Sequence, residues 1–305
     1  MNSYTAALSH QQAETLREVL DRQGYDFEAK PYSLFAARKG KLTVTVYEKG
    51  PKVLIQGKET EDFIRFTLEP EVTGVAKLGY EEVHDAEHFA PHFGVDESGK
   101  GDYFGPLVIA GVYTDAEITR GLIQAGIMDS KRITSANRIR QLAAKIRDTP
   151  GCITTVVVIS PEKYNTLHAS FKNLNRMLAW GHAQAIQNLV AARPACPRAL
   201  SDQFARPEIL QQALQSKGLT LKLDQRTKGE SDTAVAAASI LAREAFIDWI
   251  DKTSLTSGTV LPLGASAAVI HAAREWVARE GPDALAKVAK LHFKTTESVM
   301  AKSNM

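Results

Sequence analysis

The sequence predicts an α/β domain built on a mixed sheet, preceded by a small α+β module. From residue 93 onward, short apolar runs alternate with helical patterns, which is typical of an α/β domain. Before residue 80, one helical pattern is followed by apolar runs that turn signals separate, which is typical of an antiparallel meander. A chain of 305 residues also exceeds the usual size of one domain.

The composition is that of an ordinary globular protein, with 44% hydrophobic and 24% charged residues. The first residues, MNSYTAALSHQQAE, have neither a basic leader nor an apolar core, and no run approaches the roughly 18 apolar residues of a membrane span. The two cysteines, Cys152 and Cys196, show no metal-ligand spacing and cannot form a disulfide framework. We therefore expect a cytoplasmic protein with no membrane partner.

The N-terminal module begins with a short amphipathic helix over residues 10–23, which has Leu16, Val19 and Leu20 on one face and ends at Gly24. Strands are predicted over residues 33–38, 41–48 and 52–56, because tight-turn pairs separate them. Another helix is predicted to begin at Thr60, its cap.

Basic residues cluster on the meander, against the single acid Glu48. A lysine-bearing strand face could bind a phosphodiester backbone through charge and shape. It could equally be a solvated face whose lysines discourage edge-to-edge aggregation. The residues alone leave both interpretations open; the cluster comprises Lys30, Arg38, Lys39, Lys41, Lys49, Lys52 and Lys58.

An acidic stretch before His88 lacks helical periodicity and is interpreted as a linker. We place the N-terminal module at residues 1–80, the linker at 81–92 and the α/β domain at 93–305. Strands of the α/β domain are predicted over residues 93–96, 106–113, 153–159 and 199–202, and long helices over 172–192 and 233–249. Ligand sites in such sheets lie at strand ends.

The adjacent carboxylates Asp96 and Glu97 end the first of these strands, and the turn Gly99-Lys100-Gly101 follows them. A rigid acidic pair beside a flexible cationic turn suggests metal ions that meet a phosphate. A polar turn between two strands would use the same residue types.

Further candidates lie at other element ends. Asp202 ends a short apolar run, as a metal ligand in an open sheet would, although a turn or N-cap aspartate looks the same. Glu230 and Asp232 precede a helix rich in small residues, and the helix dipole also explains acids there. Spacing does not choose between these two acids. Phosphate contacts are predicted for Lys131, Lys172 and Lys228, although a solvated surface lysine is the more common role of such a residue.

These motifs carry a family resemblance. The string GVDESGKGDYFGPLVIAGVY resembles ribonuclease HIII, a type 2 ribonuclease H. The module before residue 81 is similar to the TBP-like substrate-binding domain of that family. The other matching blocks, in family order, are MDSKRIT, KNLNRMLAWGH, SDQF, TKGE followed by AVAAASILAR, LPLGA and KLHFKTT.

The resemblance implies an RNase H-like fold and an endonuclease that hydrolyses the RNA strand of RNA–DNA hybrids to 5′-phosphate products. It implies two divalent ions, Mg²⁺ or Mn²⁺, held by Asp96, Glu97, Asp202 and Glu230. Glu230 is preferred to Asp232 because that family carries its acid directly after Lys-Gly. Hard oxygen ligands suit both metals. The family implies a monomer with no obligatory protein partner.

Recognition of the hybrid is assigned to Ser98, Gly99, Lys100 and Gly101. Glycines let the backbone approach a minor groove and bond 2′-hydroxyls, while the lysine holds a phosphate. Ribonuclease HII usually carries arginine in this turn and a C-terminal tyrosine motif that acts at RNA–DNA junctions. No tyrosine follows Tyr164 here. We therefore expect cleavage within runs of ribonucleotides and weak incision at a single one.

Overall fold

The structure is a computed structural model that describes residues 3–74, 86–127, 133, 135–227 and 229–301. The chain forms two compact units, residues 1–86 and 87–305. Within the described residues, no helix has the length and apolar character needed to cross a bilayer. The predicted linker, residues 81–92, lies outside the described residues as far as residue 85. In the rest of this range, Ala86–Phe89 form helix α4, and His92 begins strand β6.

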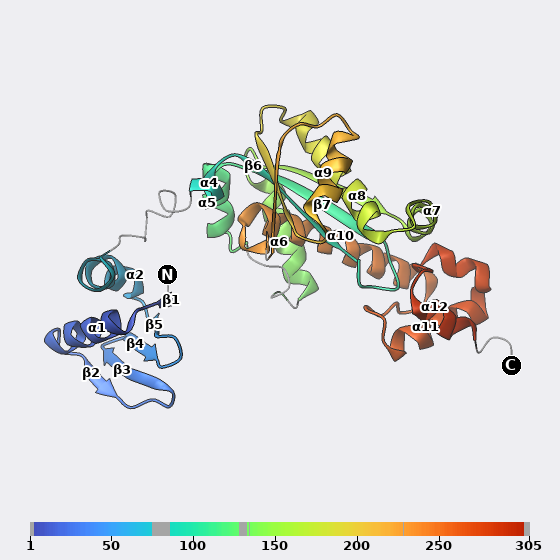
Figure 1. Ribbon diagram of the computed structural model, residues 1–305. Coiled ribbons are helices and arrows are strands. Elements are labelled where there is room, and N and C mark those ends of the chain that lie inside the picture. Colours follow the sequence, from blue (N-terminus) through green and yellow to red (C-terminus); the bar gives the residue numbers. More distant parts are fainter. Residues whose placement is uncertain (1–2, 75–85, 128–132, 134, 228, 302–305) are drawn as a thin grey trace. The chain divides into compact units, whose positions relative to one another are not determined.

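The N-terminal unit is an antiparallel sheet with helices on one face (Figure 1). Its strand order is β1-β5-β4-β3-β2. Helix α1 and the helical segment that follows the sheet bury Leu16, Leu20 and Ile64 against Val44 and Ile55. The elements are β1 (Ser3–Ala7), α1 (His10–Arg22), β2 (Asp26–Glu28), β3 (Ser33–Lys39), β4 (Leu42–Tyr47), β5 (Lys52–Gln56), α2 (Thr60–Phe63) and η1 (Ile64–Thr73).

The predicted helix and meander are confirmed, but two edge strands, β1 and β2, were not predicted from the sequence. Strand β2 has only three residues, all of them exposed, so it carries no apolar alternation. The predicted cap at Thr60 is wrong: Glu59 holds the N-cap position and makes no side-chain capping bond. Instead, the Thr60 hydroxyl donates to the Gly57 carbonyl at 2.8 Å.

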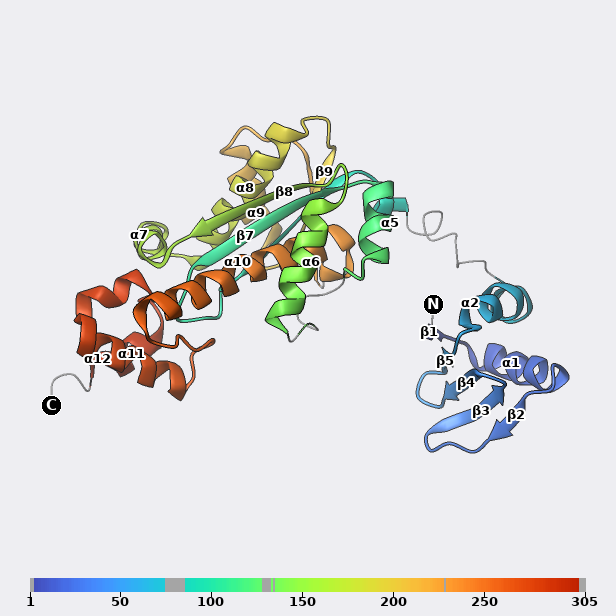
Figure 2. The same ribbon diagram turned by 180° about the vertical axis from the view of Figure 1, so that it is seen from behind.

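The second unit contains a five-stranded mixed sheet of order β10-β9-β6-β7-β8 (Figures 1 and 2). Strands β6, β7 and β8 are antiparallel neighbours, whereas β9 runs parallel to both β6 and β10. The predicted fold class is therefore confirmed, with β10 as an unpredicted edge strand. The strands are β6 (His92–Ser98), β7 (Leu107–Thr114), β8 (Ile153–Ile159), β9 (Arg198–Asp202) and β10 (Lys222–Arg226).

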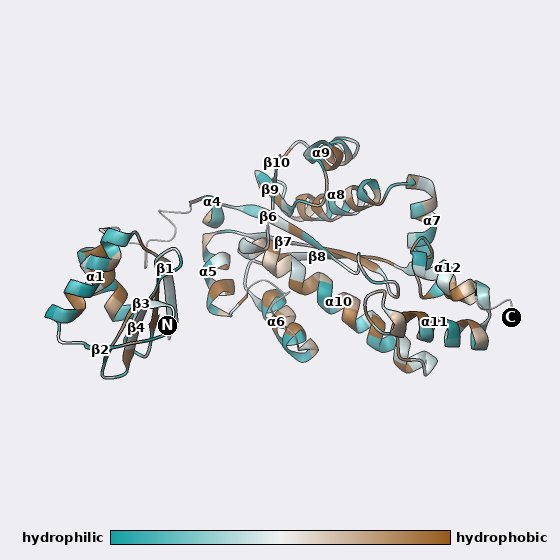
Figure 3. Cartoon of the chain, turned by 60° about the horizontal axis from the view of Figure 1, so that its bottom comes forward, coloured by the Kyte–Doolittle hydropathy of each residue, from teal (hydrophilic) through white to brown (hydrophobic). Residues whose placement is uncertain are grey.

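Helices cover both faces of this sheet (Figure 3). Helix α8 (Leu174–Ala192) and α9 (Pro207–Gln215) lie on one face, and α10 (Thr233–Ser257) lies on the other with α5 (Ala116–Gln124) and α6 (Ala136–Asp148). Beyond the sheet, α7 (Pro161–Phe171) packs with η4 (Pro282–Lys287), and α11 (Ala267–Glu280) packs with η4 and α12 (Lys294–Met300). A single turn, η3 (Gly229–Ser231), leads into α10.

Helix α10 packs on β6 without side chains between the two backbones. A Cβ atom added to Gly94 would lie 2.2 Å from the Ala234 carbonyl carbon and 2.3 Å from the Val235 nitrogen. Real Cβ atoms do not approach backbone so closely, so only glycine fits at this position. The small residues at the start of α10 allow this close packing against the sheet.

We expect Gly94→Ala to lower the free energy of unfolding by about 3 kcal/mol, because helix and strand must move apart. Urea denaturation measures the change. Gly121→Ala is the matched control: Gly121 lies in α5, and its added Cβ would meet nothing closer than 3.9 Å. That control should be neutral or stabilising, since alanine favours a helix. Equal losses in both variants would contradict the packing argument.

Candidate active site

The parallel pairing of β6 and β9 brings two predicted acids to one edge of the sheet. Val95 pairs with Ser201, so the next residues, Asp96 and Asp202, follow on neighbouring strands. Glu97, one residue further along β6, is also mostly buried. A pocket of about 370 Å³ opens here, lined by Asp96, Glu97, Ser98, Gly99, Lys100, Gly101, Asp202, Ser239 and Arg243.

Asp202 is held by the segment that precedes α10. Its Oδ1 accepts a hydrogen bond from the Gly229 amide at 2.9 Å. A Cβ at Gly229 would lie 2.9 Å from the Asp202 Cα, so the glycine allows this segment to lie directly against β9. Glu230 is the next residue in the chain, and its side chain lies outside the described atoms. Lys131 and Lys228 also lie outside the described residues.

Glu97 is bound by a buried imidazole. The Nε2 of His182, from α8, lies 3.0 Å from Glu97 Oε2, and the His182 side chain is fully buried. On the other side of the ring, Nδ1 lies 3.2 Å from the Ser201 hydroxyl, which also donates to the Asp202 carbonyl at 2.9 Å. His182 therefore connects the acid of one strand to the backbone of the other.

The carboxylates of the acidic pair differ in proton affinity. Burial, reinforced by the charge of Glu97, raises the pKa of Asp96 to about 7. Burial alone would also raise the pKa of Glu97, but the hydrogen bond from His182 and the charges of His182 and Lys100 outweigh it and lower the pKa. Asp96 therefore holds a proton more readily than Glu97 does.

Positive groups lie in the same pocket as the acids. Lys100 Nζ lies 3.5 Å from Glu97 Oε1 and 5.8 Å from the centre of the Phe204 ring. Arg243, from α10, also lines this pocket. The pocket thus offers hard oxygen donors and two cations side by side, a set that suits divalent ions and a phosphate group.

The position of Lys172 differs from the sequence expectation. Lys172 does not begin the long helix: it ends α7 in a left-handed conformation with φ of 51°, and Asn173 caps α8 by accepting from the Arg176 amide. Lys172 is exposed and is not among the residues that line the acidic pocket. Sequence reasoning also did not assign His182, Ser239 or Arg243, although each lies in a block that the resemblance covers.

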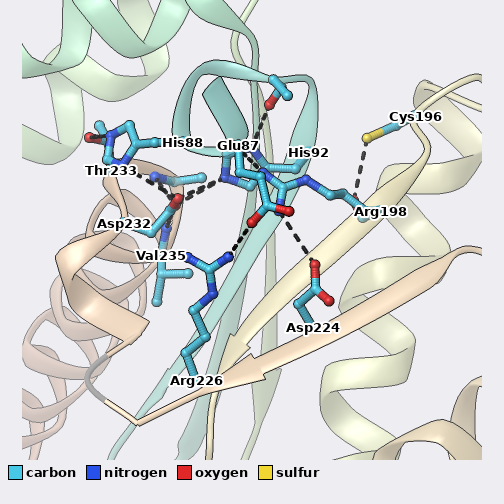
Figure 4. A network of polar contacts seen from close by, with 12 residues as sticks. Glu87, His88, His92, Cys196, Arg198, Asp224, Arg226, Asp232, Thr233 and Val235 are labelled. Carbon is cyan, nitrogen blue, oxygen red and sulfur yellow. Dashed lines mark hydrogen bonds and ion pairs between the residues drawn. The ribbon is translucent and has the colours of Figure 1, made fainter. Parts of the chain in front are cut away.

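The alternative fourth acid, Asp232, lies in a different environment (Figure 4). Its carboxylate caps α10 by accepting from the amides of Ala234 and Val235, and it accepts from His92 Nε2 at 3.0 Å. The residue is 5% exposed and does not line the acidic pocket. Asp232 therefore joins the start of α10 to the start of β6.

Around Asp232, further contacts tie the beginning of the second unit to the sheet (Figure 4). His88 Nε2 lies 2.9 Å from the Thr233 hydroxyl. Arg226, on β10, pairs with Glu87 at 2.7 Å, and Arg198, on β9, donates to the Glu87 carbonyl. These contacts connect residues 87–92 to β9, β10 and α10, and none of their side chains lines the acidic pocket.

We expect Asp232→Asn to lower the free energy of unfolding by about 1–3 kcal/mol at neutral pH. Asparagine can cap the helix, but it cannot accept a charge-assisted bond from His92. Burial alone would raise the pKa of Asp232, but the His92 hydrogen bond and the charges of His92 and His88 outweigh it and lower the pKa. The stability that this shift supplies is present above the ordinary aspartate pKa and is lost as the pH falls through the lowered one.

The difference in the free energy of unfolding between the unaltered chain and Asp232→Asn should therefore become smaller in acid. Urea denaturation at neutral and acidic pH measures it. Asp283→Asn, at an exposed position of η4, is the control and should leave stability unchanged at both pH values. A difference that persists undiminished in acid would exclude the charge as its source.

Comparison with known proteins agrees with the division of the chain into two units. The family model described as Ribonuclease HII matches residues 93–296, and a model described as a domain of unknown function (DUF3378) matches residues 5–73. The Ribonuclease HIII of Protochlamydia amoebophila (strain UWE25) is 42% identical over 299 residues, covering 98% of this chain and 97% of its own. The Ribonuclease HIII of Chlamydia trachomatis serovar L2 is 40% identical over 305 residues, covering 99% of each chain.

Solved structures show the same fold over both units. The crystal structure of Bst-RNase HIII in complex with Mn²⁺ matches with a TM-score of 0.68 at 28% identity and covers 98% of each chain. Aquifex aeolicus RNase H3 matches with a TM-score of 0.55 at 26% identity, covering 95% of this chain and 100% of that one. The full-length identity, the matched domain and the shared fold together show that the chain belongs to the ribonuclease HIII family of ribonuclease H enzymes.

Proposed function

We propose that the chain hydrolyses the RNA strand of RNA–DNA hybrids endonucleolytically, with two divalent metal ions, and leaves 5′-phosphate ends. The observation that carries the proposal is the pocket in which Asp96, Glu97 and Asp202 lie together with Lys100. Phosphodiester hydrolysis needs an activated water and stabilisation of the charge that develops on the leaving oxygen. Two ions held by carboxylates supply both.

The residues present fit Mg²⁺ or Mn²⁺. We assign Asp96 and Asp202 as the most direct ligands, with Glu97 and Glu230 completing the set. Burial and repulsion by Glu97 raise the pKa of Asp96, and a bound cation would offset that repulsion. Among the described side chains, no three His, Cys, Asp or Glu groups form a ready metal cluster. The proposed site therefore depends on Glu230 and on the carboxylates being drawn together by ions and phosphate.

The glycine turn supports the proposed choice of RNA. Gly99 has φ of 85°, and a Cβ there would lie 2.3 Å from the Pro106 carbonyl oxygen, so the fold itself requires this glycine. A Cβ at Gly101 would meet nothing within 4 Å. The fold leaves room for a side chain at Gly101, which supports an open approach for a ribose 2′-hydroxyl, while Lys100 holds the adjacent phosphate. The predicted phosphate contacts of Lys131, Lys172 and Lys228 remain proposals.

We expect Asp96→Asn to reduce Mg²⁺-dependent cleavage of a labelled hybrid at least about 1,000-fold while hybrid affinity changes little. Asp248→Asn, which alters an exposed aspartate of α10 paired with Arg140, is the control and should cleave normally. Cleavage by Asp96→Asn at the normal rate would exclude the assignment. Asp232→Asn should retain cleavage, whereas Glu230→Gln should lose it.

A substrate panel tests the proposed specificity in the same assay. Hybrid, double-stranded RNA, double-stranded DNA and a duplex with one embedded ribonucleotide are compared in Mg²⁺ and in Mn²⁺. The proposal requires cleavage of the hybrid within its ribonucleotide run and weak incision of the last duplex, since no tyrosine follows Tyr164. Efficient incision at the single ribonucleotide would contradict this preference.

We also propose that the N-terminal unit binds the hybrid through the sheet face opposite its helices. Val44, Val46 and Ile55 point to the core, so alternation places Arg38 and Lys52 on the opposite face. Lys30 Nζ lies 3.4 Å from the Thr45 hydroxyl, on that same face. Lys39 does not belong to this surface, because it donates to the Gln23 carbonyl at 2.7 Å and lies over Tyr25.

Replacing both Arg38 and Lys52 with glutamine should weaken hybrid binding and reduce the slope of log affinity against log salt by about 2. Arg65→Gln, on the helical side of this unit, is the control. Fluorescence anisotropy at several salt concentrations measures both. An unchanged salt slope in the double variant would show that the basic face is merely solvated.

We also propose that the protein acts as a monomer. Both cysteines are free, which agrees with the proposed reducing cytoplasm.

A further inference from the structure

Lys290 is a fully buried lysine that faces no carboxylate at ion-pair distance among the described residues. Its ammonium donates to three backbone carbonyl oxygens instead: Asp102 at 2.8 Å, Phe104 at 3.3 Å and Gly105 at 2.7 Å. An ammonium has three donor hydrogens and no acceptor, so these carbonyls match its bonding capacity. Burying a charged group without such partners would be strongly unfavourable.

Aromatic rings complete the environment of this side chain. Nζ lies 5.6 Å from the centre of the Tyr164 ring and 5.9 Å from that of Phe246, distances at which ring faces attract a cation. Burial lowers the pKa of Lys290 to about 7, and the charge of Asp102 opposes that shift. The three carbonyl oxygens also favour the charged form, because they accept its hydrogen bonds.

The three carbonyls belong to the segment that directly follows the glycine turn. Other bonds from the C-terminal part of the chain hold the same segment: Tyr103 N donates to the Gly264 carbonyl at 2.9 Å, and Gly105 N donates to the Val288 carbonyl at 2.8 Å. The Gly264 amide in turn donates to the Asp102 carboxylate at 2.7 Å. Lys290 is the member of this set that gathers three carbonyls at one point.

The beginning of the turn is held by packing and not by the carbonyl bonds of Lys290. Gly99 packs against Phe246 of α10 so closely that a Cβ would lie 2.8 Å from the ring. With Gly99 held by α10 and Asp102–Gly105 held by Lys290, Lys100 and Gly101 span two anchored points. The position of these two residues relative to the acidic pocket therefore depends on Lys290.

We propose that Lys290 is a positioning residue for substrate recognition: it fastens the Asp102–Gly105 segment and thereby holds the Gly99-Lys100-Gly101 turn where it meets the hybrid. This inference rests on the proposed hybrid-cleaving function and adds a residue nearly 200 positions away from the turn in sequence. Lys290 touches neither substrate nor metal. It acts through the backbone of the turn.

Arginine cannot replace this lysine, because its planar fork does not direct donors at three convergent carbonyls. Methionine is the informative substitution, since it keeps an unbranched chain and removes every donor hydrogen. Glutamine retains an amide with two donor hydrogens and provides a graded variant. Lys287→Met is the matched control, because Lys287 lies in the same C-terminal region and is exposed.

The experiment uses the full chain. Steady-state cleavage of a hybrid with a continuous ribonucleotide run gives kcat and KM, and anisotropy without divalent metal gives affinities for that hybrid and for DNA duplex of the same sequence. Thermal unfolding is followed in parallel. For Lys290→Met we expect KM to rise about tenfold or more, kcat to change less than KM, and the preference for hybrid over DNA to fall by a similar factor. Lys290→Gln should lie between, and Lys287→Met should match the unaltered chain.

Each other outcome decides against the inference. A lower unfolding temperature with unchanged KM and unchanged hybrid preference would assign Lys290 to stability alone. Failure of both Lys290 variants to fold at low temperature would do the same. If the unaltered chain and Lys287→Met did not cleave the hybrid, the proposed function itself would be wrong, which distinguishes the two failures.

Discussion

Burial of several carboxylates at one edge of a mixed sheet is the constraint on which the rest of the second unit depends. Parallel pairing of β6 with β9 sets Asp96 and Asp202 on neighbouring strands, and Glu97 adds a third acid. Like charges in a partly buried pocket repel, and the raised pKa of Asp96 shows that repulsion together with burial. Hydrogen-bond donors around the pocket stabilise these carboxylates: His182 and Lys100 contact Glu97, and the Gly229 amide donates to Asp202.

Helices α8 and α10 contact the acid-bearing strands in different ways. Helix α8 supplies His182, which bonds to Glu97 on one side and to Ser201 on the other, and so links the two acid-bearing strands. Helix α10 packs backbone to backbone on β6 at Gly94 and carries Ser239 and Arg243 into the pocket wall. Its capping residue, Asp232, is occupied by His92 and two amides. Asp232 therefore caps the helix and does not line the acidic pocket.

The proposed recognition of the hybrid requires a backbone that is both open and fixed. Gly101 leaves space for a ligand, but an unsupported glycine turn would lose its shape, since glycine has more backbone freedom than any other residue. Anchors on either side, Phe246 beside Gly99 and Lys290 beneath Asp102–Gly105, remove that freedom. The C-terminal part of the chain is therefore connected physically to the turn at the acidic pocket.

The resemblance implied that Asp96, Glu97 and Asp202 act together. The sequence by itself determined the fold class, the approximate extent of the meander and of β6 to β9, and the position of each of these acids at a strand end. These features follow from local apolar periodicity, which a single segment carries within itself. It did not reveal the exposed strand β2, whose residues bury nothing, nor the left-handed Lys172 between two helices.

Only the tertiary structure decided the roles of His182, Asp232 and Lys290. The sequence does not show which histidine, aspartate or lysine is buried, because the roles of these residues depend on partners 85 to 188 positions away. These partners are Glu97 for His182, His92 for Asp232 and Asp102 for Lys290. Long-range packing brings those partners together, and no local pattern records it.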